Sequence, residues 1–165
     1  MKIIIKIIII IGTVFCSTIE KAPFFYLKSI DKKDYFLTDQ YNNKKPVVLS
    51  FFATWCIPCR KELPLLDSLS YVYDKIDFNY LAVGSENKPI KSGHIIKFKN
   101  DLNLTQNILI DKYGRVFEKF SKSGSLPLTV LISDEGDILY LTEKFDEDTS
   151  INILADEINK VLSEN

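Results

Sequence analysis

The sequence predicts an α/β fold in which helices cover both faces of a mixed central sheet. Three observations support this prediction: an apolar run at Val47–Ala53, apolar residues at helical spacing after it, and an amphipathic C-terminal segment. With 165 residues, 46% hydrophobic and 26% charged, the chain is long enough for one well-buried domain. We expect that domain to occupy residues 18–165, because no repeat or low-complexity linker interrupts them.

The first strands are predicted between residues 47 and 84. Val47–Ala53 is apolar almost throughout, as in a strand buried on both faces. The helix expected next has apolar residues on one face, namely Leu65, Leu66, Leu69, Val72 and Tyr73. Ile76–Gly84 alternates apolar and polar residues and predicts a second strand. Strand, helix and strand in this order predict a parallel pair joined by a right-handed crossover.

The second half of the chain predicts one more helix and three more strands. The helix is expected over Pro89–Asp101 and a short strand over Asn107–Ile110. Leu128–Ser133 is an apolar strand, and the turn residues Asp134–Asp137 return the chain into Ile138–Leu141 as a hairpin.

The C-terminal segment predicts an amphipathic helix that covers the sheet. Its apolar residues recur at helical spacing: Ile151, Leu154, Ile158, Val161 and Leu162. The acidic stretch Glu143–Asp148 before it is expected to be a loop that leads into the helix, rather than a binding patch.

The first seventeen residues differ from the rest of the chain. Lys2 and Lys6 flank Ile3–Ile5, and the unbroken apolar run Ile7–Phe15 follows. A basic start and an apolar stretch of about 7–15 residues are typical of a secretory signal, whereas a membrane-spanning helix needs about 20 apolar residues. We interpret residues 1–17 as a signal peptide or an N-terminal membrane anchor, and we expect an exported, periplasmic or otherwise extracytoplasmic protein.

Cys16 stands where this apolar run ends. The segment Thr13-Val14-Phe15-Cys16 resembles the processing site of bacterial lipoproteins, except that Phe15 replaces the small residue that normally precedes the cysteine. Two interpretations remain open: Cys16 carries a lipid, or it has no role of its own, being either removed with the signal or an incidental apolar residue.

Charge and composition exclude several classes of function. The formal net charge of −1 gives no electrostatic case for binding a nucleic acid, which usually needs a concentrated basic face. His94 is the only histidine, so no metal site or nucleophile that needs several imidazoles is expected. Because lysines surround His94 in its predicted helix, we expect its side chain to be solvated.

The segment Trp55-Cys56-Ile57-Pro58-Cys59 lies where the buried strand gives way to a helix. A cysteine in the first turn of a helix becomes a thiolate more easily, because the N–H groups and the dipole there stabilise negative charge. We expect Cys56 to be the exposed attacking sulfur and Cys59, one turn further, to resolve the mixed disulfide. Pro58 suits the first turn, where its missing N–H costs nothing.

Two other interpretations of the cysteine pair compete with redox chemistry. Half a zinc site would need further ligands, and no second pair follows. A purely structural disulfide would suit an exported protein, but a bridge across two residues constrains little of the unfolded chain.

The segment from Phe51 to Pro64, FFATWCIPCRKELP, resembles the active-site signature of TlpA/ResA-type thioredoxin-like proteins, a group of periplasmic or membrane-tethered thiol–disulfide oxidoreductases related to the redoxin and AhpC/TSA proteins. The resemblance covers about residues 22–162. It implies a thioredoxin-like three-layer sandwich with an N-terminal β-hairpin, to which Ala22-Pro23-Phe24 and the region of Asp39 correspond. Leu126-Pro127 resembles the family's proline loop.

The resemblance also implies three residue roles. Pro127 would be a cis-proline that faces the disulfide and presents backbone groups to a substrate peptide. Glu62 matches a carboxylate near the buried cysteine that exchanges a proton with Cys59, although an exposed glutamate on the helix remains the alternative. Trp55 would shield the disulfide as a packing platform.

The sequence departs from the family at three positions. Phe52 stands where the family commonly has a second tryptophan, and Leu126 and Leu128 flank Pro127 where smaller or hydroxylated residues are frequent.

The resemblance implies an enzyme that exchanges electrons with protein thiols and disulfides, chiefly as a reductase. Its partners would be an exported substrate, such as apocytochrome c cysteines, and a membrane or exported electron donor. The Cys56–Cys59 disulfide would be its only redox group, with no other cofactor, and we expect a monomer. A non-catalytic binding module remains an alternative. A thiol peroxidase is disfavoured, because Leu49 and Ala53 occupy the positions of its proline and threonine before Cys56.

Overall fold

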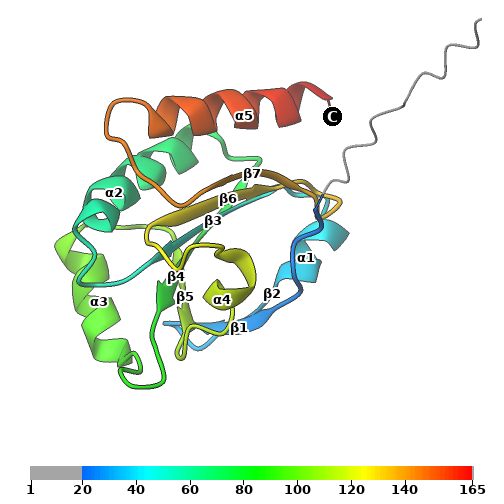
Figure 1. The fold of residues 1–165 in the computed structure, drawn as a ribbon. Coiled ribbons are helices and arrows are strands. Elements are labelled where there is room, and N and C mark those ends of the chain that lie inside the picture. Colours follow the sequence, from blue (N-terminus) through cyan, green and yellow to red (C-terminus); the bar gives the residue numbers. More distant parts are fainter. Residues whose placement is uncertain (1–19, 165) are drawn as a thin grey trace, which may run out of the picture.

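The computed structural model describes residues 20–164, and the predictions for residues 1–17 and Cys16 lie outside this range. Seven strands form one mixed sheet in the order β2-β1-β5-β4-β3-β6-β7 (Figure 1). The strands are β1 Tyr26–Ser29, β2 Asp34–Phe36, β3 Val47–Phe52, β4 Asp77–Val83, β5 Asn107–Asp111, β6 Leu128–Ile132 and β7 Ile138–Thr142. The helices are α1 Leu37–Asn42, α2 Ile57–Val72, α3 Ser92–Asp101, α4 Phe117–Phe120 and α5 Ser150–Glu164.

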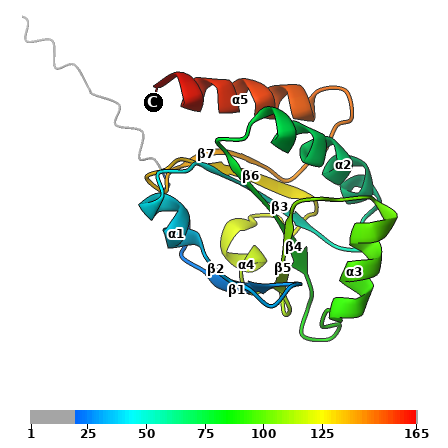
Figure 2. The ribbon, with the colours of Figure 1, turned by 180° about the vertical axis from the view of Figure 1, so that it is seen from behind.

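Strand β3, which lies inside the sheet between β4 and β6, is fully buried because helices cover both faces of the sheet. One face packs against α2, α3 and α5, and the other against α1 and α4 (Figures 1 and 2). Alternate side chains of β3 enter the two cores: Val48 and Phe52 pack on the α2 side, and Leu49 and Phe51 on the α4 side. The predicted α/β sandwich is therefore confirmed.

Two predicted strand pairings are confirmed: β3 and β4 run parallel around α2, and β6 and β7 form the antiparallel hairpin. The structure also shows that β4 and β5 are parallel. β1 and β2 form the N-terminal hairpin that the resemblance implied. The amphipathic α5 covers the sheet through Leu154, Ile158 and Val161.

Two details of the sequence interpretation were wrong. The helix expected from Pro89 begins only at Ser92, because Lys91 has an extended backbone with φ −102° and ψ 125°. Asp39, which the resemblance assigned to the hairpin region, lies in α1. The short helices α1 and α4 were not predicted.

Gly84, at the end of β4, lies where two backbone segments approach closely. A Cβ atom at Gly84 would lie 2.1 Å from the backbone oxygen of Lys112, a distance that requires the backbone to move. We expect Gly84→Ala to destabilise the fold by about 1–3 kcal/mol. Chemical denaturation measures this loss. Gly93→Ala is the matched control: its Cβ meets nothing within 4 Å and it lies in α3, so it should stabilise by up to about 1 kcal/mol. Equal effects of the two variants would contradict this packing argument.

Candidate active site

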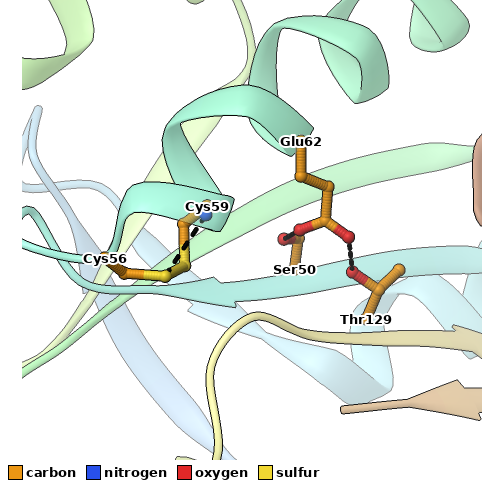
Figure 3. The surroundings of a disulfide bond; sticks show 5 residues. All are labelled: Ser50, Cys56, Cys59, Glu62 and Thr129. Atoms are coloured by element: carbon orange, nitrogen blue, oxygen red, sulfur yellow. Dashed lines mark hydrogen bonds between the residues drawn. A yellow bond between two sulfur atoms is a disulfide. The ribbon is translucent and has the colours of Figure 1, made fainter. Parts of the chain in front are cut away.

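The two cysteines of the motif form a disulfide at the start of α2. Cys56 is the N-cap of this helix, and Cys59 lies in its first turn beside Pro58. Their sulfur atoms are bonded, with an S–S distance of 2.01 Å (Figure 3). The predicted positions of both cysteines and of Pro58 at the start of this helix are therefore confirmed.

Cys56 Sγ occupies the place of a helix-capping acceptor. It accepts a hydrogen bond from the backbone N–H of Cys59 at 3.2 Å. When the disulfide is reduced, the same N–H and the helix dipole favour the thiolate form of Cys56. The local backbone thus prepares this sulfur for nucleophilic attack.

The exposure of the cysteines differs in degree from the prediction. Cys56 is only 4% exposed rather than open to solvent, because the residue packs into the core on the α2 side of the sheet. Cys59 is fully buried. Cys56 is nevertheless the more accessible of the two cysteines, as expected, since Cys59 has no exposed surface.

Glu62 is buried behind the disulfide, one turn further along α2. It is 2% exposed, so the alternative of a surface glutamate is wrong. Its carboxylate accepts hydrogen bonds from Thr129 Oγ1 at 2.8 Å and from Ser50 Oγ at 3.2 Å. Residues three apart on a helix share a face, and Figure 3 shows Cys59 and Glu62 on the same side of α2.

The surroundings of Glu62 make its carboxyl a usable proton acceptor near neutrality. Burial raises its pKa to about 7, although the hydrogen bonds from Thr129 and Ser50 oppose this rise. A carboxyl group with a pKa near 7 can take up or release a proton under physiological conditions. The sequence interpretation identified Glu62 but missed Ser50 and Thr129, whose only signal is a hydroxyl within each apolar strand.

The loop before β6 contains the predicted proline. The Leu126–Pro127 peptide bond is cis, as the resemblance implied, and Pro127 is buried. Leu126 lines a groove of about 550 Å³ together with Trp55. The groove also receives aromatic side chains from Tyr113 and Phe117.

Trp55 lies on the surface beside the disulfide. Its side chain is 69% exposed, so it forms a raised apolar surface rather than a packed cover. Trp55 also lines a second, smaller pocket, to which Lys88, Lys91 and His94 contribute. His94 is exposed, as predicted, but the sequence did not show that it lies beside Trp55.

Residues 20–164 contain neither a cluster of side chains that could bind a metal ion nor a helix that could span a membrane. Between residues 20 and 164, no group of three or more His, Cys, Asp or Glu side chains could hold a metal ion. In the same range no helix has the length and apolar character needed to cross a membrane.

Known proteins resemble this chain in both sequence and structure. ResA, a thiol–disulfide oxidoreductase of Geobacillus thermodenitrificans, is 33% identical over 117 residues, which cover 71% of this chain and 64% of ResA. The thioredoxin-like protein YneN of Bacillus subtilis is 32% identical over 121 residues, covering 71% of this chain and 66% of YneN. The matched region thus spans slightly less than two thirds of each relative.

A solved structure and a family model agree with these relatives. A candidate protein disulfide isomerase from Bacteroides thetaiotaomicron superposes with a TM-score of 0.74 at 27% identity, covering 87% of this chain and 89% of that one. The fold is therefore thioredoxin-like. Residues 19–141 match the AhpC/TSA family model. This match, over most of the chain, shows that the protein belongs to the AhpC/TSA family.

Proposed function

We propose that this protein is a thiol–disulfide oxidoreductase that exchanges electrons with other proteins, chiefly as a reductase. One observation carries the proposal: the Cys56–Cys59 disulfide caps α2, with the buried carboxyl of Glu62 one turn behind it. The relative ResA, which bears the name of this activity, supports it.

The reaction begins at Cys56. Its thiolate attacks one sulfur of a partner disulfide, a bond forms between the two, and the partner's other sulfur leaves as a thiolate. Cys59 loses its proton to the Glu62 carboxylate and attacks Cys56 Sγ. The Cys56–Cys59 bond forms and the partner's first sulfur leaves, so two electrons pass to the partner. The cysteine pair supplies all the redox chemistry of this cycle, and we propose no other cofactor.

The cellular setting follows from the N-terminal sequence. The basic and apolar residues 1–17 support export to an extracytoplasmic compartment, with the segment cleaved or kept as a tether. Such a reductase needs an exported protein substrate and an exported or membrane-bound electron donor.

The activity is tested by incubating the reduced protein, residues 18–165, with insulin or with glutathione disulfide. Consumption of protein thiols with reduction of either disulfide is the expected result. If neither disulfide is reduced, the binding-module alternative replaces the enzyme. Consumption of hydrogen peroxide without disulfide reduction would instead indicate a thiol peroxidase.

A further inference from the structure

The segment Ser121–Leu126, between α4 and β6, forms one wall of the groove beside the disulfide. Gly124 and Leu126 line this groove opposite Trp55. The segment has no regular secondary structure. Its backbone N–H groups therefore need partners other than a helix or strand ladder.

The N–H groups of residues 121–125 all find partners within the protein. Ser121 donates to the backbone oxygen of Phe117, as the last turn of α4. The N–H groups of Gly124 and Ser125 donate to the hydroxyl oxygens of Ser121 and Ser123, at 2.8 and 3.2 Å. The remaining two, from Lys122 and Ser123, reach a single side chain.

That side chain is Glu143, which follows β7 and lies twenty residues further along the chain. Its carboxylate accepts the N–H of Lys122 at 2.9 Å and that of Ser123 at 3.1 Å from each oxygen. It also accepts a hydrogen bond from Ser121 Oγ. Burial raises the pKa of Glu143, but the hydrogen bonds from Ser121, Ser123 and Lys122 outweigh it and lower the pKa to about 2. The Glu143 carboxylate is therefore charged at physiological pH.

One N–H group in this segment has no partner. Among the described residues, the backbone N–H of Leu126, the residue before the cis peptide bond, forms no hydrogen bond. Leu126 lines the groove, so this donor is placed where an extended substrate backbone could accept from it.

We propose that Glu143 is a positioning residue, which holds the Ser121–Leu126 segment in the form that binds the substrate polypeptide next to its target disulfide. The inference rests on the proposed function. Without the carboxylate, three donors lose their acceptor and the segment gains freedom, which a bound polypeptide must then remove. A small disulfide that touches only Cys56 makes no such demand.

The test compares two substrates in steady-state kinetics, a disulfide-bonded peptide of about ten residues and glutathione disulfide. For Glu143→Ala, which removes the acceptor of all three donors, we expect KM for the peptide to rise about tenfold with kcat nearly unchanged. Rates with glutathione disulfide should stay within about twofold of the wild type. Glu135→Ala, at an exposed site in the turn at the other end of the β6–β7 hairpin, is the matched control.

Hydrogen exchange measures independently how strongly Glu143 protects the backbone amides of the Ser121–Leu126 segment. The amides of Lys122 and Ser123 should exchange at least about tenfold faster in Glu143→Ala, while those of β6 stay protected. Ser121→Ala, which removes one donor to Glu143 and the acceptor of Gly124, should raise the peptide KM in the same direction if Glu143→Ala does not fold.

Three outcomes would overturn the inference: an unchanged peptide KM, a parallel loss of activity with both substrates, or unchanged exchange at Lys122 and Ser123. Failure of the proposed function differs from all three, because the wild-type protein would then reduce neither substrate.

Discussion

Replacing Cys59 with serine should trap the protein in a mixed disulfide with its substrate, whereas replacing Cys56 with serine should abolish exchange. Cys56 has the only exposed surface of the pair, and its sulfur lies at the helix N-terminus, so it attacks first. Without the Cys59 sulfur, residues 20–164 contain no second cysteine that could resolve the adduct. Mass spectrometry of each variant after incubation with a disulfide-bonded peptide measures the result.

The expected pattern is an adduct on Cys56 in Cys59→Ser and no adduct in Cys56→Ser. The double variant is the control for reaction elsewhere in the chain. An adduct on Cys59 in the Cys56→Ser variant, with none in Cys59→Ser, would reverse the order of the two sulfurs. Absence of an adduct in both variants would contradict nucleophilic exchange altogether.

Replacing Glu62 with glutamine should slow exchange about 100-fold at pH 7, because the variant cannot take the proton from Cys59. The side chain keeps its shape and can still bond Thr129 and Ser50, so the fold should persist. The rate should also lose the dependence on pH that a group with a pKa of about 7 confers. Stopped-flow kinetics of the Cys56–Cys59 pair between pH 5 and 9 measure both effects.

The same substitution should change how stability depends on pH. Burial raises the pKa of Glu62 from its ordinary value of 4.5 to about 7, so the folded protein holds this proton where the unfolded chain has released it. Glu62 therefore lowers stability progressively as the pH rises from about 4.5 to 7. Relative to the wild type, Glu62→Gln should gain about 3 kcal/mol between pH 4.5 and pH 8.

Denaturant unfolding at several pH values tests this gain. The matched control is Glu157→Gln in α5, where the carboxylate forms an ion pair with Lys160 at the surface. It should leave the pH profiles of both rate and stability nearly unchanged. An unaltered rate profile in Glu62→Gln would remove Glu62 from the chemistry and leave it a packing role only.

The site could be predicted from the sequence where its residues are close together along the chain. The strand that ends at Phe52 and the helix that starts after Cys56 place the cysteines by local structure alone. Glu62 follows from helical spacing, but its burial depends on Ser50 and Thr129, which only the assembled sheet brings to it.

Contacts between distant segments account for what the sequence did not predict. Glu143 lies in an acidic stretch that suggests only a solvated loop, yet it bonds a segment some twenty residues earlier. The short helices α1 and α4 have six and four residues, too few for a helical period to show. The start of α3 depends on the backbone of Lys91, which is extended although lysine is a good helix former, so propensity alone does not predict this boundary.

The most direct test is the redox equilibrium of the Cys56–Cys59 pair. The domain of residues 18–165 is equilibrated in thiol–disulfide buffers of defined potential. Thiol alkylation then measures the fractions of reduced and disulfide-bonded protein. We predict a single reversible two-electron transition, at a potential near or below about −270 mV for a reductase. A value near about −120 mV would instead indicate an oxidant that installs disulfides. If no reversible transition occurs, the protein is not a thiol–disulfide oxidoreductase.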